Sequence, residues 1–490
     1  MQKTRPILAW ETLLDIARTD APAPLRERVE HALRRAIADG RLSPGSALPP
    51  SRTLAENLGV SRWVITETYG QLVAEGVLDA RAGSVTRVAA TVLAERMLSY
   101  PPPVDHRPAP TTAPPDARFD LRPGLPDLRA TPRARWGSAV KAALSSIADR
   151  DLAAAHPGGY APARQAVSDY LGRSRHVATT ADRVVITHGA SDGMSILARE
   201  LRRQGQRAIL VEDPSWPRLR DIAQTHGVRT IPIPVDDDGI DVEALAAASV
   251  RTGARVALLT PAHQFPIGAA LSPARREQVI AWAHAVDGLI IEDDYDAEFR
   301  YDRRPIAALQ RLAPDRVALI GSLSKSVSPA LGLGWMVLPH GLNPEHSPAM
   351  PSLIDQAALA HFLVRGDLER HLRAARCRFR RRRAALLDAL RAELPDASIS
   401  GIAAGMHLLL ELPAGADAAE LARRGRDHGL ALTPLRRYED VSRRPEALVL
   451  GYGNLDDTLV SAATAALATL LRARSETPVA LVRSERTLTG

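Results

Sequence analysis

The sequence is poor in cysteine and has no long apolar run. Cys377 is the single cysteine among 490 residues, which excludes an internal disulfide framework and leaves no thiol cluster for a metal. No apolar run approaches the roughly 20 residues of a membrane-spanning helix. Glu11 and Asp15 interrupt the apolar N-terminal stretch, unlike in a signal peptide. We therefore expect a cytoplasmic protein in a reducing compartment, with no membrane partner and no metal site.

Lysine is scarce as well. Of the 63 basic residues only three are lysines, and Lys325 follows an apolar stretch, 317–320, that is typical of a short buried strand. A desolvated lysine amine can lose its proton and attack a carbonyl group, whereas arginine stays protonated. The hydroxyl residues Ser322 and Ser324 stand beside it. We interpret Lys325 as the residue that forms a Schiff base with pyridoxal 5'-phosphate; the alternative is a surface lysine without a chemical role.

The first ninety residues follow the pattern of a winged helix-turn-helix. Apolar residues recur every four positions over 25–39, which predicts a helix. Two further helices are predicted over 52–58 and 62–75, the second capped by Ser61, and two short strands over 77–88. In this motif the second helix of the turn lies in the major groove of double-stranded DNA.

Six residues of this segment are candidates for DNA contact. We expect those on the helices to reach base edges or phosphates, and those between the strands to reach the neighbouring minor groove. They are Arg52, Ser61, Arg62 and Thr66 on the helices, and Arg81 and Gly83 between the strands. Residues 1–92 carry 12 basic and 10 acidic groups, so the motif, and not the net charge, favours DNA over a small protein-interaction domain.

A proline-rich stretch separates this segment from the rest. Seven prolines between 93 and 118 predict an extended, semi-rigid linker. The expected organisation is a DNA-binding domain over 1–92, a linker over 93–118, a large domain over 119–475 and a tail over 476–490.

In the large domain short β-branched runs alternate with helical patterns, which indicates a mostly parallel sheet covered on both faces. Ala190 and Ser191 follow a predicted strand and open a helix, where free backbone amides favour a phosphate group. Asp293 follows another strand, and a protonated pyridine nitrogen is a suitable partner for a carboxylate there. Tyr295 is placed to reach the phenolic oxygen of the same ring. Taken alone, this acidic turn with its four carboxylates would favour a solvated surface loop.

The combination of motifs resembles a known family. The run LSPGSALPPSRTLAENLGVSRWVITETYGQLVAEGVLDARAGS resembles the DNA-binding domain of GntR-type bacterial regulators. The runs THGASDGMSILA, TPAHQFPIG, EDDYDAEFRYDRRPI and GSLSKSVSPALGLGWMVLP resemble fold-type-I pyridoxal-phosphate enzymes. HQFP followed by EDDYDAEFRY is similar to MocR/GabR-type regulators. This resemblance implies an α/β fold class: an N-terminal winged helix-turn-helix joined to an aminotransferase-like domain of class I/II, with a mostly parallel sheet and a smaller C-terminal α+β subdomain.

The resemblance also implies roles for individual residues. Lys325 matches the Schiff-base lysine, and Asp293 and Tyr295 match the partners of the ring nitrogen and the phenolic oxygen. The other implied cofactor-binding residues are Ala190, Ser191 and Ser322 at the phosphate and Trp216 near the ring. Arg218 matches an arginine that binds an effector carboxylate, and Arg436 or Arg437 is the candidate for a second one, with Arg437 preferred.

One position departs from the family pattern. Seven residues after the lysine the family usually has an arginine on the cofactor phosphate, and here the residue is Gly332. Losing a charge-assisted contact costs about 1.5–3 kcal/mol. Cofactor binding is then either weak, compensated elsewhere or lost.

An arginine-rich stretch has two interpretations. Residues 370–383 contain eight arginines, which suggests a nucleic-acid patch. Leu372, Cys377 and Phe379 interrupt them at helical spacing, and we favour an amphipathic helix with a solvated face.

These observations predict a transcriptional regulator that senses pyridoxal phosphate or an amino compound through its aminotransferase-like domain. The alternative is a working aminotransferase with an accessory DNA-binding domain. The resemblance further implies a homodimer with a head-to-tail arrangement.

Overall fold

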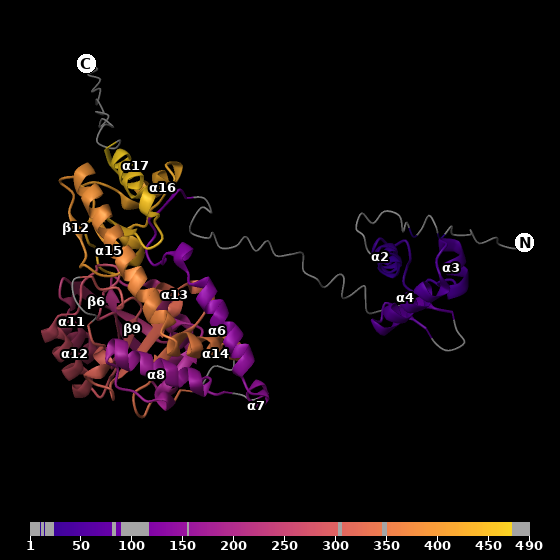
Figure 1. The fold of residues 1–490 in the computed structure, drawn as a ribbon, viewed down its shortest axis with the longest axis horizontal. Coiled ribbons are helices and arrows are strands. Elements are labelled where there is room, and N and C mark those ends of the chain that lie inside the picture. Colours follow the sequence, from indigo (N-terminus) through magenta and orange to yellow (C-terminus); the bar gives the residue numbers. More distant parts are fainter. Residues whose placement is uncertain are drawn as a thin grey trace, which may run out of the picture. The chain divides into compact units, whose positions relative to one another are not determined.

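The chain divides into two compact units, residues 1–111 and 112–490 (Figure 1). The computed structural model describes residues 10, 14, 24–80, 85–89, 117–153, 156–301, 306–344 and 350–472. Most of the predicted linker over 93–118 and the whole predicted tail over 476–490 lie outside these residues, so the domain boundaries stay predictions.

Within residues 24–80 and 85–89, the smaller unit contains three helices and a two-stranded hairpin. Its elements are α2 (Leu25–Ala38), α3 (Ser51–Leu58), α4 (Arg62–Ala74), β1 (Leu78–Asp79) and β2 (Arg87–Val88). Gly59 takes a left-handed conformation between α3 and α4, with a φ of 61°, which a glycine adopts without strain. The Ser61 hydroxyl accepts a hydrogen bond from the Val64 amide and caps α4. Apolar side chains of all three helices and both strands form one core, as the predicted winged helix-turn-helix requires.

An eight-stranded sheet forms the centre of the larger unit. Its strands, in spatial order, are β4 (Val184–Thr187), β11 (Gly334–Val337), β10 (Val317–Ser322), β9 (Leu289–Asp294), β8 (Val256–Leu259), β5 (Ala208–Asp213), β6 (Arg229–Asp236) and β7 (Gly239–Ile240). The strands from β10 to β6 are mutually parallel, whereas β11 and β7 are antiparallel to their neighbours. Ile320 of β10 pairs with Asp293 of β9. The lysine turn and the acidic turn therefore meet at one edge of the sheet.

Helices cover both faces of this sheet. Successive residues of β10 point to opposite faces, so Ala318 packs into one apolar cluster and Leu319 into another. The helices on the Ala318 side are α9 (Ala190–Arg203) and α10 (Pro217–Thr225). The clusters on the Leu319 side take in α6 (Arg133–Ser146), α8 (Ala161–Arg175), α11 (Val242–Thr252), α12 (Pro273–Ala285) and α14 (Leu353–Val364). The short α7 (Asp149–Leu152) follows α6.

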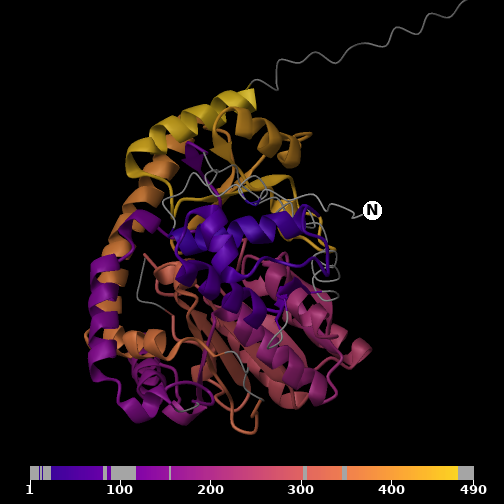
Figure 2. The same ribbon diagram turned by 90° about the vertical axis from the view of Figure 1, so that its right-hand side faces the viewer.

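The long helix α15 (Asp367–Glu393) leads from the sheet into a smaller C-terminal subdomain (Figures 1 and 2). That subdomain has an antiparallel sheet of β12 (Ile399–Ser400), β13 (His407–Glu411) and β15 (Ala447–Gly451). It also contains α16 (Ala418–Asp427), α17 (Val460–Arg472), and β14 (Leu430–Ala431) paired with β3 (Phe119–Asp120). The predicted fold class, with its C-terminal α+β subdomain, is confirmed.

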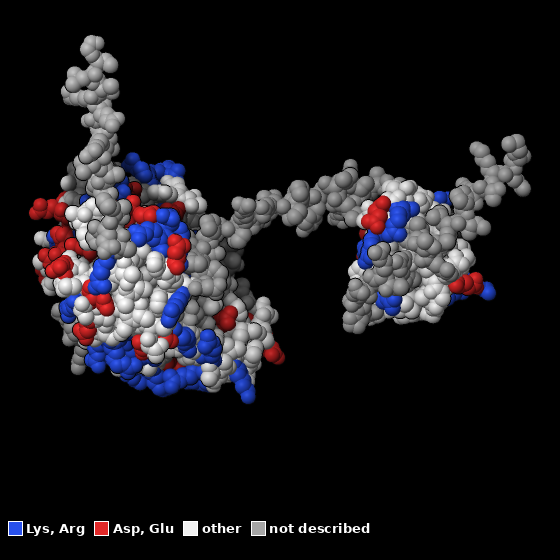
Figure 3. All heavy atoms as spheres, turned by 90° about the horizontal axis from the view of Figure 1, so that it is seen from above, with Lys and Arg blue, Asp and Glu red and all other residues white. Residues whose placement is uncertain are grey.

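Helix α15 contains the arginine-rich stretch, and one of its arginines is buried. Arg382 is 3% exposed, pairs with Asp127 at 3.1 Å and donates to the Tyr452 carbonyl at 3.0 Å. The prediction of a solvated arginine face therefore holds for exposed residues such as Arg380 and fails for Arg382, which joins the helix to the C-terminal subdomain. On the face of the large unit seen in Figure 3, basic and acidic side chains of the described residues are interspersed, with more basic ones along one margin.

Among the described residues, no helix combines the length and the apolar character that crossing a membrane requires.

Candidate cofactor site and nucleic-acid interface

Lys325 lies where β10 ends and the short helix α13 (Leu323–Ser326) begins. The Ser322 hydroxyl accepts a hydrogen bond from the Ser324 amide at 3.0 Å, which caps this helix. The Lys325 amine donates to the Gly124 carbonyl at 2.6 Å and lies 5.6 Å from the centre of the Trp216 ring. Burial lowers the pKa of Lys325, and this effect outweighs the opposing charge of Asp293. A larger fraction of the amine is therefore unprotonated and nucleophilic.

The turn before α9 faces the same space as the lysine turn. Gly189 has a φ of 88°, and no side chain caps the first turn of α9. A Cβ placed on Gly189 would lie 3.5 Å from the Ser322 hydroxyl and 3.9 Å from the Ser324 hydroxyl. Free amides at a helix N-terminus, together with these two hydroxyls, suit a phosphate group.

Asp293 lies one residue before the end of β9, and its carboxylate has no side-chain hydrogen bond among the described residues. Burial raises its pKa to about 7, and the neighbouring Asp294 adds to this rise while Lys325 opposes it. A protonated ring nitrogen would supply the missing partner. The unpaired carboxylate, the amine and the phosphate turn together fit pyridoxal phosphate.

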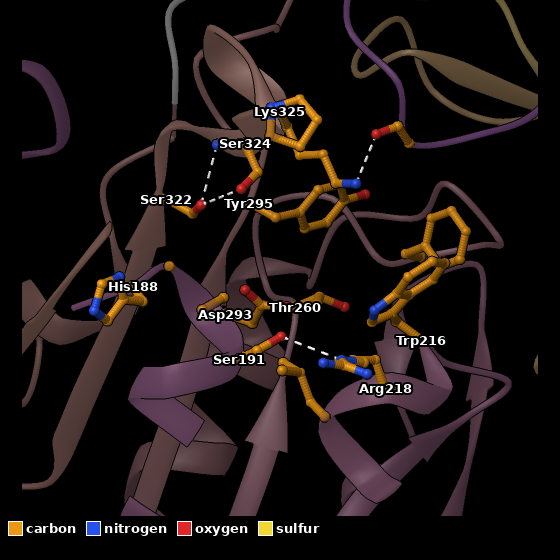
Figure 4. Close-up of a pocket in the computed structure, with 16 residues that line it drawn as sticks. His188, Ser191, Trp216, Arg218, Thr260, Asp293, Tyr295, Ser322, Ser324 and Lys325 are labelled. Atoms are coloured by element: carbon orange, nitrogen blue, oxygen red, sulfur yellow. Dashed lines mark hydrogen bonds between the residues drawn. The ribbon is translucent and has the colours of Figure 1, made fainter. Parts of the chain in front are cut away.

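These groups line one cavity of about 280 Å³, here called the cavity (Figure 4). Its lining residues are Gly124, His188, Gly189, Ala190, Ser191, Trp216, Arg218, Leu219, Thr260, Phe265, Asp293, Tyr295, Ser322, Ser324, Lys325 and Pro329. They include every residue that the sequence predicted for the cofactor. The Arg218 guanidinium lies 3.5 Å from the Ser191 hydroxyl, as the dashed line in Figure 4 marks.

Arg437 is not among the lining residues. It is exposed in the 3-10 helix Leu435–Tyr438, while its neighbour Arg436 pairs with Glu446 at 2.5 Å. Tyr438 of the same turn stacks on Trp216 with ring centres 6.1 Å apart. The role of Arg437 in effector binding therefore stays a prediction.

Gly332 faces open space. Its φ is 56°, and no atom lies within 4 Å of the position that a Cβ would take. Of the described residues that line the cavity, the one arginine is Arg218. Neither observation excludes the phosphate group, which the amides and hydroxyls described above can hold.

Sequence reasoning missed several residues near the cavity. Gly124 comes from a segment about two hundred residues before Lys325, and nothing local marks the contact. His263 belongs to the HQFP motif, which carried the resemblance without a role; its Nδ1 lies 3.1 Å from the Tyr295 hydroxyl. Glu212 is buried, accepts a hydrogen bond from the Thr260 amide at 3.1 Å, and has a pKa raised to about 7 by burial.

Four of the six predicted DNA-contacting residues are described, and all four are exposed on the helices or at a helix cap. Ser61, Arg62 and Thr66 lie at the start of α4, and Arg52 pairs with Glu56 across an exposed turn of α3 at 3.2 Å. Arg81 and Gly83 lie outside the described residues.

Trp63 was not predicted as a contact. Its side chain is 66% exposed on the first turn of α4, between Arg62 and Val64. Its position directly after Arg62, among the candidate DNA-contacting residues, is the sequence signal that could have indicated a contact.

Comparisons with known proteins account for both units. Residues 25–88 match the family described as bacterial regulatory proteins, gntR family, and residues 135–446 match aminotransferase class I and II. A pyridoxine biosynthesis transcriptional regulator, PdxR, from Corynebacterium glutamicum is 33% identical over 454 residues, which cover 90% of this chain and 94% of the relative. The probable rhizopine catabolism regulatory protein MocR from Rhizobium meliloti is 30% identical, covering 89% of this chain and 92% of the relative.

The fold of the large unit is similar to solved aminotransferases. An archaeal alanine:glyoxylate aminotransferase superposes with a TM-score of 0.66 at 24% identity, over 73% of this chain and 91% of the other. Pyridoxal phosphate is the cofactor of this domain class, and DNA is the partner of the small unit. The chain belongs to the MocR/GabR-type transcriptional regulators, in which a GntR-family winged helix-turn-helix is joined to an aminotransferase-like domain of class I and II.

Proposed function

We propose that this regulator attaches pyridoxal phosphate to Lys325 and detects the cofactor, or an amino compound that reacts with it, in the cavity. The observation that carries the proposal is the convergence of an amine, an unpaired carboxylate and an uncapped helix N-terminus in one cavity. The fused DNA-binding unit favours a sensor over a metabolic enzyme, because a metabolic aminotransferase does not need one.

Each lining residue has a distinct task. Asp293 holds the ring nitrogen, Tyr295 contacts the phenolic oxygen and Trp216 packs near the ring. Ala190, Ser191 and Ser322 bind the phosphate group, with Ser324 as an addition from the geometry. When bound, pyridoxal phosphate supplies an electrophilic carbon that amines attack.

Arg218 is the proposed contact for an effector carboxylate, since its guanidinium reaches the mouth of the same cavity. An amine effector competes with the Lys325 amine for the cofactor, and its carboxylate would pair with Arg218. Arg437 is the second candidate for this contact.

On the small unit, Arg52 contacts a phosphate, while Ser61, Arg62 and Thr66 face the major groove. Arg81 and Gly83 are the proposed minor-groove contacts. Trp63 adds an apolar surface that suits a thymine methyl group. The functional form is proposed to be a homodimer, head-to-tail, that presents two such units to the operator.

The Lys325→Ala variant tests the proposal. The wild-type protein should acquire the visible absorbance of lysine-bound pyridoxal phosphate, and the variant should not. Affinity for an operator, identified by mapping the promoter fragments that the full chain binds, should change with the cofactor only in the wild type. Identical cofactor-dependent binding by both proteins would contradict a sensor built on Lys325.

A working aminotransferase is the second candidate, favoured by the presence of the lysine, Asp293 and Tyr295 together in the cavity. Sustained conversion of an amino donor and a keto acid would support it. A single half-reaction, or none, would favour the sensor.

A further inference from the structure

A buried histidine–aspartate pair lies behind Tyr295, outside the lining of the cavity. His263 follows β8 and Asp296 follows β9, and both are 2% exposed. The Nδ1 atom of His263 lies 2.9 Å from Oδ2 of Asp296 and 3.1 Å from the Tyr295 hydroxyl. One ring nitrogen is thus shared between a carboxylate and the hydroxyl that faces the cofactor.

The chemistry of the pair fixes the direction of these hydrogen bonds. A carboxylate without a proton only accepts hydrogen bonds, so the hydrogen atom between the two groups is carried by Nδ1 of His263 and points toward Asp296. Nδ1 then has no lone pair to accept the Tyr295 proton. The tyrosine oxygen can share the same N–H, and its own proton is left free to point into the cavity.

We propose that His263 and Asp296 are positioning residues that make the Tyr295 hydroxyl a hydrogen-bond donor to the phenolic oxygen of pyridoxal phosphate. This inference rests on the proposed function, because it assumes the cofactor pose given above. Without Asp296, His263 could carry its proton on Nε2, and Nδ1 would then accept the tyrosine proton and withdraw it from the cavity.

The C-terminal subdomain shields the pair from water. A Cβ at Gly405 would collide with the His263 ring and lie 2.8 Å from Asp296, so the backbone there packs directly on the pair. The hydroxyls of Tyr301 and Tyr452 both donate to the Gly405 carbonyl and hold this loop in place. His263 Nε2 and Asp296 Oδ1 are buried without hydrogen-bond partners among the described residues. Among the described residues, the one hydrogen bond that meets the distance and angle criteria at the Asp296 carboxylate comes from His263. The Tyr295 hydroxyl lies near the same carboxylate, and burial together with this charge raises the pKa of Tyr295 well above its usual value, so the hydroxyl keeps its proton.

Several other titratable groups surround Tyr295 and influence how its hydroxyl responds to pH. They are Asp293 and Asp296 from β9 and its turn, Glu212 from β5, His263 after β8, His407 from β13 and Lys325 from α13. His407 lies with its ring centre 4.9 Å from that of His263. Burial and the nearby His263 lower the pKa of His407 well below its usual value, so His407 is neutral and offers no competing charge.

Asp296→Asn tests the proposal with almost no change in shape. A hydrogen bond donated to the phenolic oxygen makes that oxygen a weaker acceptor. It then stabilises less well the proton on the nitrogen that joins Lys325 to the cofactor. Losing the donor should therefore raise the midpoint of the visible pH titration by about one unit, a tenfold change. Tyr295→Phe should give the same shift, and the double variant should shift no further. Glu200→Gln, a carboxylate-to-amide change at a buried position on α9, is the matched control and should leave the midpoint unchanged.

A second measurement does not depend on the cofactor. Imidazole ¹⁵N NMR of the cofactor-free full chain should report the Nδ1–H tautomer of His263 in the wild type and the Nε2–H tautomer in Asp296→Asn. An unchanged tautomer, or additive shifts in the double variant, would overturn the positioning role. If the wild type acquires no visible band while the His263 tautomer changes as expected, the proposed attachment of pyridoxal phosphate to Lys325 is wrong. The proposed direction of the hydrogen bond from His263 to Asp296 would then still be correct.

Discussion

At the residue scale, Asp293 shows how a residue of a ligand-binding site can lower the stability of the folded protein. Burial raises the pKa of this carboxyl to about 7, from 3.8 in an exposed chain. Between these values the folded protein keeps a proton that the unfolded chain releases. Stability therefore falls as pH rises from about 4 to about 7, and the full penalty persists at higher pH.

The Asp293→Asn variant should escape this penalty. In the cofactor-free protein its melting temperature should exceed that of the wild type by several degrees at pH 8, because a rise of about three pKa units corresponds to at most roughly 4 kcal/mol of lost stability. The difference should shrink at pH 5. The variant should also bind pyridoxal phosphate more weakly, because the amide cannot pair with a protonated ring nitrogen. Calorimetry at the two pH values and a spectral titration measure both effects, and equal melting temperatures at pH 8 would contradict the stated pKa.

Gly332→Arg should restore the phosphate contact of the family. The open space around Gly332 admits the side chain, so cofactor affinity should rise by roughly tenfold to a hundredfold. The left-handed backbone should cost about 1–2 kcal/mol of stability in any non-glycine residue. Gly332→Ala separates the backbone cost from the phosphate contact, since it should lose stability without gaining cofactor affinity. Unchanged affinity in the arginine variant would mean that the amides and hydroxyls already satisfy the phosphate.

At the scale of the elements, the parallel sheet explains which predictions succeeded. The turns with Ser191, Asp293 and Lys325 follow parallel strands, whose carboxyl ends meet at one edge of the sheet, so short motifs far apart in sequence could be joined into one site. Contacts brought in by other segments could not be predicted. Gly124, in the segment before α6, contacts Lys325, and Gly405, in the C-terminal subdomain, packs on His263. A local sequence pattern does not record such contacts.

Helix α4 should owe part of its sequence specificity to Trp63. Its side chain is exposed, so Trp63→Ala should leave the melting temperature unchanged and weaken operator binding by about 1–3 kcal/mol. Replacing one operator thymine at a time with uracil should reveal a position where the lost methyl weakens the wild type and not the variant. Gln71→Ala, exposed near the end of the same helix, is the control. A uniform loss at every thymine would contradict a methyl contact.

Helix α15 should act through its buried arginine. Arg382→Met leaves the Tyr452 and Gly453 carbonyls and Asp127 short of a donor, at about 1–3 kcal/mol for each group. Arg380→Ala, on the exposed face, should change stability by less than about 0.5 kcal/mol and leave operator affinity unaltered. Chemical denaturation and operator titration measure both. Weaker operator binding by Arg380→Ala at unchanged stability would revive the nucleic-acid interpretation of this helix.

At the scale of the whole molecule, each unit has its own apolar core. Ligand binding in the cavity must therefore change DNA binding by changing how the two units are placed relative to each other. If the predicted linker over 93–118 sets that geometry, its length should matter more for the response than for either binding event. Doubling a flexible linker costs only about 0.6 kcal/mol in closure entropy, so operator affinity itself should change little.

Ten glycine and serine residues inserted into 93–118 should therefore leave the visible band of pyridoxal phosphate intact and operator affinity within about threefold of the wild type. The difference in operator affinity measured with and without pyridoxal phosphate should disappear, because a longer flexible segment no longer fixes one unit against the other. Fluorescence anisotropy on a labelled operator measures both quantities for the same sample. An insertion of equal length after residue 475, in the predicted tail, serves as the control and should preserve the response. A linker variant that keeps the full response would show that the signal passes by a route that does not depend on linker length.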